Sequence, residues 1–284
     1  MDSKDPIRSF YSMTDCMLEI MEFCKWSSLV ALSHVDRTGR DRARLLTVLT
    51  SLDKTGAMIL GTVPWAVTAE KLNDIHLPRE MQIVTPSGTF ATWAECLLQI
   101  GYCMVDDGGI LSYDPYVRRV TAFWRFRAGV SILIIEARKP SIFEAVFNLG
   151  LTSEMMVLDT SRLYSFYPQL QNKEITLSAF RRPSPLTIKW WTDRAFKHHE
   201  TTSRFTHTCG YACPAIWRYT DGMKGIGEFA WGGIDNDKDF EGNMGDSLRV
   251  SSLRLKWRIG IHCVNEHCQY NSRFYATLSE VRYD

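Results

Sequence analysis

Two stretches near the start of the chain carry apolar residues at the spacing of an amphipathic helix. From Met13 to Cys24, and again from about Arg37 to Leu49, apolar positions recur every three to four residues. A shorter helix fits residues 27–32 between them, with Ser27 as its N-cap. Residues 1–54 are therefore predicted to form a small helical unit.

The next part of the chain, residues 55–165, alternates between strand and helix patterns. Apolar runs bounded by turn residues predict strands at 57–62, 81–85, 117–126, 130–137 and 155–158. Helical spacing predicts helices at 63–72, 92–100 and 141–149, with Gly101 ending the second of these. Asp106 and Asp107 are expected in a loop before Gly108. The predicted fold class is α+β, with a mixed sheet at the centre.

Residues 166–284 form an irregular, aromatic-rich and cysteine-rich C-terminal region. One strand pattern stands out near its end, where basic residues alternate with apolar ones and give the strand one basic face (Arg249, Arg254, Lys256 and Arg258). Such a face can meet phosphates or can be a solvated sheet surface. The adjacent His198 and His199, followed by Glu200, are expected in an exposed loop.

Composition narrows the class of partner. The 284 residues contain 45% hydrophobic and 23% charged residues, as an ordinary globular protein does. The formal net charge of +1 does not favour a nucleic-acid partner. No apolar run is long enough to span a bilayer, and the chain opens without an apolar signal segment. A soluble protein of the cytoplasm or nucleus is the expectation.

Two cysteine knuckles supply the clearest candidate site. Cys209 and Cys213 form one pair, Cys263 and Cys268 form the other, and about fifty residues separate the pairs. Four thiolates on two tight turns complete a tetrahedral zinc site with no open position, so the predicted zinc is structural. Two disulfides, or four buried apolar cysteines, are the alternatives. Three neighbouring histidines are possible replacements for a thiolate ligand: His207, His262 and His267.

The N-terminal helices resemble an F-box. The resemblance rests on residues 19–24 and 28–40, which contain an apolar helix, the segment Leu29-Val30-Ala31-Leu32-Ser33-His34-Val35 and the closing Arg40. It implies a protein partner, the Skp adaptor of a ubiquitin ligase, docked on residues 13–40. The segment Thr14-Asp15-Cys16-Met17 stands in place of the Leu-Pro opening of the family. A plain amphipathic helical lid is the alternative.

The order of elements from Ile59 to Leu158 resembles the nucleotidyltransferase fold. The resemblance implies that Gly61 and Thr62 hold nucleotide phosphates at a helix start, while acidic residues on two later strands bind two magnesium ions. Those acidic positions correspond to Glu80 and Glu136. Gln82 stands where a second carboxylate belongs, and a neutral amide is a poor ligand for a hard cation. The resemblance therefore implies a degenerate core with little or no activity.

The whole chain also resembles a family of proteins expanded in mushroom-forming fungi, with no biochemical function attached to it. The resemblance rests on Phe23 to Ser28, Ile83 to Thr89, Tyr167 to Leu170 and Cys209 to Pro214. Three functions are then expected, in this order. The first is a non-catalytic binding or adaptor protein with a retained nucleotide site. The second is an active magnesium-dependent transferase, aided by Asp106 or Asp107. The third is a ubiquitin-ligase substrate adaptor.

Overall fold

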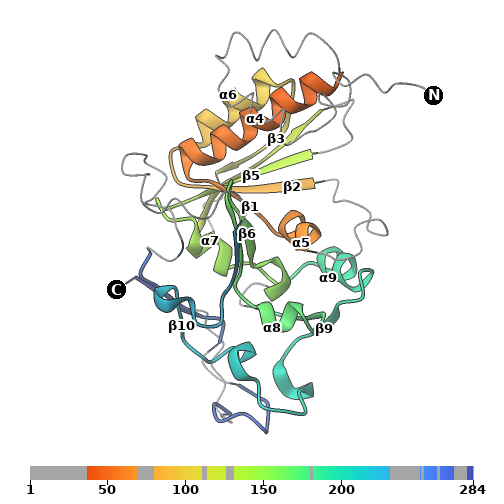
Figure 1. Cartoon of the computed structure of the whole chain (residues 1–284), viewed down its shortest axis with the longest axis vertical. Coiled ribbons are helices and arrows are strands. Elements are labelled where there is room, and N and C mark those ends of the chain that lie inside the picture. Colours follow the sequence, from red (N-terminus) through yellow and green to blue (C-terminus); the bar gives the residue numbers. More distant parts are fainter. Residues whose placement is uncertain are drawn as a thin grey trace, which may run out of the picture.

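The structure is a computed structural model that describes residues 37–68, 80–110, 114–125, 131–179, 182–230, 250, 253–260, 263–271 and 280–283. Most of the predicted F-box-like segment, residues 13–36, lies outside the described residues. An eight-stranded mixed sheet forms the centre of the molecule, and the cysteine region extends away from it (Figure 1). The predicted mixed α and β architecture is confirmed at this level. None of the helices described here combines the length and the hydropathy that a membrane-spanning segment requires.

The first half of the described chain builds most of this sheet. Its helices are α4 (Arg37–Thr55), α5 (Thr62–Thr68), α6 (Phe90–Gln99) and α7 (Phe143–Phe147). Its strands are β1 (Met58–Leu60), β2 (Glu80–Thr85), β3 (Cys103–Ile110), β4 (Val117–Trp124), β5 (Ser131–Ala137), β6 (Met156–Leu158) and β7 (Arg162–Ser165).

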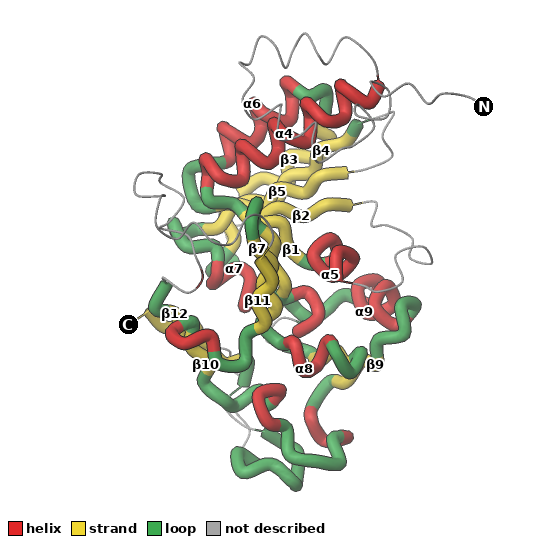
Figure 2. Tube along the Cα trace, in the orientation of Figure 1, coloured by secondary structure: helices red, strands yellow, loops and turns green. Residues whose placement is uncertain are grey.

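The second half contributes shorter elements joined by long loops (Figure 2). The helices are α8 (Pro168–Gln171) and α9 (Pro185–Thr192), with 3-10 turns that include η4 (Gly210–Ala212). The strands are β8 (Ile175–Leu177), β9 (Lys197–His199), β10 (Arg218–Tyr219), β11 (Gly227–Ala230), β12 (Leu255–Arg258) and β13 (Glu280–Tyr283).

The large sheet has the order β11-β7-β6-β1-β2-β5-β4-β3. Strands β2 and β5 pair in parallel, whereas every other pair in this sheet is antiparallel. The predicted hairpin of residues 117–137 is confirmed as β4 and β5. Strand β3 corrects the expected loop at Asp106 and Asp107, because both residues pair with β4.

Alternation of side chains along the strands creates two cores, one on each face of the sheet. Ile59, Ile83 and Ile134 point to one face, where they pack with α4 and α6. Their neighbours point to the other face and join α7, Tyr164 and Trp257 in the larger core. Both cores contain fully buried residues, such as Ile83 on one face and Val84 on the other.

The boundaries expected between units fall inside these cores. Helix α4 runs to Thr55, so the expected boundary after residue 54 lies within one helix, and Leu52 packs in the same cluster as the sheet. Strand β11 comes from the C-terminal region yet pairs with β7 at the edge of the large sheet. One connected core therefore spans the described parts of the expected central and C-terminal regions.

Candidate metal centre

The four predicted cysteines converge at one point. The sulfur atoms of Cys209, Cys213, Cys263 and Cys268 all lie within 4.8 Å of one another, and all four residues are buried. Cys209 Sγ is 3.5 Å from Cys263 Sγ, and Cys213 Sγ is 3.6 Å from Cys268 Sγ. A disulfide would require about 2.05 Å, so the disulfide alternative is wrong for this arrangement. Zinc–sulfur bonds of about 2.3 Å give tetrahedral S···S edges of about 3.8 Å.

The first knuckle is a single 3-10 turn. Cys209 precedes η4 and Cys213 follows it, so the turn brings both side chains to the same side. The amide of Cys213 donates to the Gly210 carbonyl at 3.1 Å, and Gly210 adopts a φ of 54°. Glycine adopts this left-handed conformation without steric cost, and the tight turn depends on it.

Arg218 fixes the first knuckle to the larger core. It is 1% exposed, and its guanidinium donates to the carbonyl oxygens of Tyr211 and Cys213. The guanidinium also lies 4.2 Å from the centre of the Tyr167 ring. Burial lowers the pKa of Arg218, while the hydrogen bonds and the ring contact offset part of the desolvation cost.

The second knuckle is closed by Asn265. Its side-chain oxygen accepts a hydrogen bond from the His267 amide at 2.9 Å, and its amide nitrogen donates to the His207 carbonyl at 2.7 Å. The same nitrogen donates to Cys209 Sγ at 3.1 Å, which links the two knuckles. Hydrogen bonds of this kind to ligand sulfurs orient them and stabilise thiolate charge.

The thiols have unequal acidities because they are packed together in a buried site. A hydrogen bond from Cys213 lowers the pKa of the Cys263 thiol to about 5. Burial raises the pKa of Cys209 to about 12, and the same sulfur–sulfur hydrogen bond with burial raises that of Cys213. A metal cation that binds all four sulfurs as thiolates must displace the protons of the thiols.

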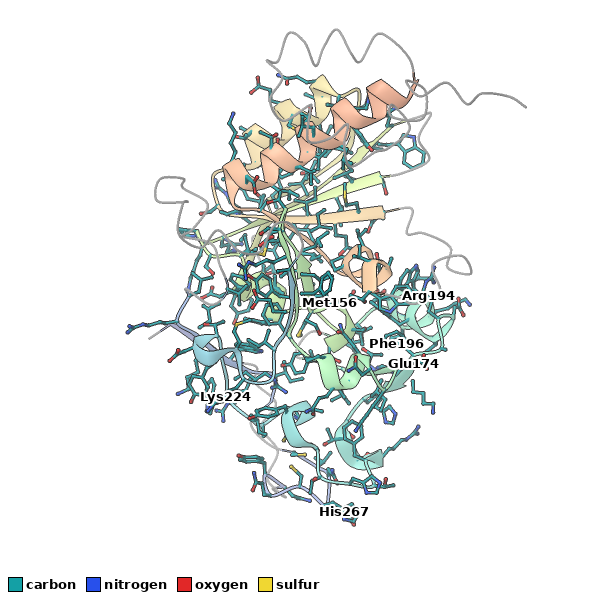
Figure 3. All side chains as sticks on the ribbon, in the orientation of Figure 1. Met156, Glu174, Arg194, Phe196, Lys224 and His267 are labelled. Atoms are coloured by element: carbon teal, nitrogen blue, oxygen red, sulfur yellow. The ribbon has the colours of Figure 1, made fainter. Side chains whose placement is uncertain are left out.

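The histidines near the knuckles lie outside this cluster. His207 and His267 are exposed, and neither belongs to the group of ligand atoms that converge. Figure 3 places His267 at the end of the molecule farthest from α4 and α6. His262 lies outside the described residues. The other four cysteines lie in apolar runs of the sequence, which predict core positions for them. Cys96 is buried, but Cys103 is exposed at the start of β3, and Cys16 and Cys24 lie outside the described residues.

The predicted nucleotide and magnesium residues fall into two separate groups. Gly61 lies against β2, where a Cβ would stand 3.5 Å from Gln82 Oε1, and Gln82 Nε2 donates to Glu80 Oε1 at 2.9 Å. Thr62 begins α5, a helix of seven residues. Gly61, Thr62 and Glu80 thus lie at one end of the parallel pair β2 and β5.

Glu136 lies at the other end of the same strand pair. The register sets Glu80 opposite Ser131 and Glu136 opposite Thr85, five residues further along. At about 3.3 Å per residue, this offset is about 17 Å. The Glu136 carboxylate is 4% exposed and accepts a hydrogen bond from the Gly88 amide at 2.7 Å. The structure therefore does not bring the two predicted magnesium ligands together.

A groove between α9 and β9 was not expected from the sequence. It has a volume of about 750 Å³ and contains a hydrogen bond of 2.9 Å between Ser178 Oγ and His198 Nε2. His198 lies in β9 rather than in the expected loop. Arg182, Lys189 and Glu200 on its walls are exposed. It is an open groove, unlike the enclosed cavities that surround most small-molecule ligands.

Comparisons of this chain with protein-family models, with curated proteins and with solved structures returned no match. The F-box, nucleotidyltransferase and fungal-family resemblances therefore stay predictions. Four buried cysteines arranged to hold a metal ion are the candidate site that the structure supports.

Proposed function

We propose that this chain is a non-catalytic binding or adaptor protein whose C-terminal region is held together by a structural zinc ion. The observation that carries the proposal is the offset of about 17 Å between Glu80 and Glu136 along the paired strands. Two-metal phosphoryl transfer needs ions about 4 Å apart, bound by carboxylates that share one site. A buried Glu136 that binds the Gly88 amide serves the fold rather than a cation.

The zinc half of the proposal rests on the chemistry of the donors. Four sulfur ligands at tetrahedral spacing suit zinc and leave no position open for a substrate. A closed site contributes folding free energy, because the unfolded chain has no preformed ligand set. All four cysteines would bind the ion, while Asn265 and Arg218 would hold the two turns in place.

The proposal also includes a weak nucleotide site at the Gly61–Thr62 turn. Gly61 adopts a φ of 77° at the end of β1, the left-handed conformation that favours glycine in turns of this kind. The neighbouring Gln82 and Glu80 are already joined by a hydrogen bond. Nucleotide binding is expected to be weak here. Carboxylates would hold the magnesium ion that accompanies a nucleotide, and Glu80 is the one acidic residue of β2 near the turn.

The test combines metal analysis with calorimetry on the purified full-length chain. One equivalent of zinc is expected, and Cys209→Ser should remove it, whereas Cys103→Ser at an exposed position should not. Titration with a nucleoside triphosphate and magnesium should give no transfer of a nucleotidyl group. Magnesium-dependent transfer that is abolished by Glu80→Ala would overturn the non-catalytic assignment. Absence of zinc from the native protein would overturn the structural role of the knuckles.

The ubiquitin-ligase adaptor function stays a separate prediction for residues 13–40. Only the last residues of that segment, at the start of α4, are described. Co-purification with a Skp adaptor, at concentrations at which F-box proteins bind it, is the measurement that checks this prediction. No binding under those conditions would remove it and leave the zinc proposal unaffected.

A further inference from the structure

A small antiparallel sheet beside the cysteine knuckles has one buried face and one face rich in aromatic and cationic side chains. Strands β10, β12 and β13 form this sheet in that order. Arg218, Leu255 and Trp257 point into the molecule and are at most 2% exposed. Their neighbours in sequence therefore point to the opposite face, since side chains alternate along a strand.

The opposite face, here called the aromatic–cationic face, consists of Trp217, Tyr219, Lys256 and Arg258. Lys256 Nζ lies 4.8 Å from the centre of the Trp217 ring and 5.2 Å from that of Tyr219. Arg258 Cζ lies 4.4 Å from the Trp217 ring centre. Tyr219 is 40% exposed, and the other three side chains are half-buried.

The third strand adds charged positions beside β12. Arg282 of β13 pairs in register with Lys256, and Glu280 pairs with Arg258. The four charged positions on these two strands are thus three cations and one carboxylate. The local charge is positive, although the whole chain carries a net charge of only +1.

We propose that the aromatic–cationic face binds single-stranded nucleic acid. This inference deepens the proposed binding function and rests on it. Aromatic rings stack on bases of any sequence, and neighbouring cations meet the phosphates between them. Lys256 and Arg258, which lie over the rings in the free protein, move to the phosphates when bases take their place on the rings. Sheets that bind RNA stack two or three bases on their aromatic side chains, a number that fits two rings on short strands. An acidic peptide would use the cations but would gain little from the two rings.

The rigid setting of the rings supports this assignment. Trp217 lies directly before the buried Arg218, whose guanidinium is bound to backbone carbonyls of the first knuckle. Trp257, behind the face, stacks on Phe147 at 4.4 Å with an angle of 6° between the rings. The face is therefore built on anchored strands, so little conformational entropy is lost when bases stack on it.

The test is fluorescence anisotropy with the zinc-loaded full chain and labelled twelve-nucleotide oligo-dT and oligo-U. Binding is expected at low salt. The logarithm of the association constant should fall linearly with the logarithm of the salt concentration. The expected slope is about −1.4, which is about 0.7 for each of two phosphate contacts. Lys256→Gln should reduce the slope by about 0.7, and Trp217→Ala should weaken binding by about tenfold.

Matched controls separate the face from general effects. Phe229→Ala removes a 62% exposed aromatic ring from β11, outside this face, and should leave the affinity unchanged. Tyr219→Ala is the second variant on the face, and it keeps the inference testable where Trp217→Ala fails to fold. A labelled oligo-glutamate peptide and a DNA duplex of equal length complete the set.

Weak binding of the peptide and the duplex, relative to oligo-dT, would support the inference. Equal binding of the peptide would overturn it in favour of a general anion surface, and equal binding of the duplex would overturn the stacking role. No binding of any oligonucleotide would also overturn it. That result would leave the zinc and transferase measurements as they stand, so the two proposals fail separately.

Discussion

The buried Glu136 carboxylate joins β5 to the loop that follows β2. Its Oε1 accepts a hydrogen bond from the Gly88 amide, and Gly88 adopts a φ of 84° that favours glycine. Arg119 lies opposite Glu136 in the antiparallel register with β4. The carboxylate is thus placed to hold a turn of the sheet in shape.

Glu136→Ala is expected to destabilise the fold. The change leaves the Gly88 amide without its carboxylate acceptor, at a cost of about 1–3 kcal/mol in the free energy of unfolding. Glu136→Gln keeps an acceptor oxygen and should cost less. Urea denaturation of both variants checks the expectation. Equal midpoints for Glu136→Ala and the wild type would contradict the structural role.

Ionisation of the buried Tyr164 lowers the stability of the protein at alkaline pH. Burial raises the pKa of Tyr164 to about 12, whereas an unfolded tyrosine ionises near pH 10. Between these values the unfolded state loses its proton first, so the free energy of unfolding falls as pH rises. Tyr164→Phe should reduce this loss between about pH 10 and 12. Melting curves at pH 8 and pH 11 measure it, and parallel losses in both proteins would contradict it.

Features that form within one short segment of the chain were predictable from the sequence. The spacing of Cys209 and Cys213 indicated a single turn, and the structure contains that turn. The separation of Glu80 and Glu136 in space was not predictable, because 55 residues lie between them in the sequence. Alternation fixes the face of a side chain, but it does not fix the register of a parallel pair.

At the scale of elements, α4 and α6 cover one face of the large sheet (Figure 1). Helical spacing between Arg37 and Leu49 predicts an apolar face on α4 that consists of Ala43, Leu45, Leu46, Val48 and Leu49. Leu46 and Val48 are buried, but Leu45 is 43% exposed. The helix meets the core along a narrower stripe, which continues to Leu52 at 1% exposure.

The difference in exposure between Leu52 and Leu45 supplies a matched pair of variants. Leu52→Ala should lower the free energy of unfolding by about 2–5 kcal/mol, because it leaves a cavity in the close-packed cluster that also contains Trp93. Leu45→Ala on the same helix should change it by less than about 0.5 kcal/mol. Urea denaturation compares the two, and similar losses would contradict the assigned faces of α4.

Strand β3 shows where element prediction from sequence falls short. Its central residues are Asp106, Asp107, Gly108 and Gly109, which have low intrinsic strand propensity and indicated a loop. Pairing with β4 overrides that propensity, with irregular register on either side of the two acids. By contrast, β4 and β5 have strong apolar alternation and were predicted with their hairpin.

At the scale of the whole molecule, the cysteine centre and the large sheet are connected through side-chain contacts. Trp257 stacks on Phe147, and Arg218 lies over Tyr167. The knuckles themselves contain few apolar contacts, since their cluster consists mainly of the cysteines and Ala215. The metal centre should therefore open without unfolding of the sheet.

Hydrogen exchange after zinc chelation tests this expectation. The amides of Cys213 and Cys268, which donate within the two knuckles, should lose protection when a chelator removes the metal. The amides of Ile83 and Ile134 in the sheet should keep theirs. The chelator saturated with zinc is the control. Loss of protection in both regions at once would show that they unfold as one unit.

The acidic, irregular strand β3 lies at the end of the large sheet, with β4 as its one neighbour among the described strands. A flat edge strand presents free backbone groups that can recruit the edge of another molecule and start aggregation. Bulges twist such an edge away from a partner strand. The register shifts of β3 on either side of Asp106 and Asp107 should therefore protect the protein from edge-to-edge aggregation at high concentration.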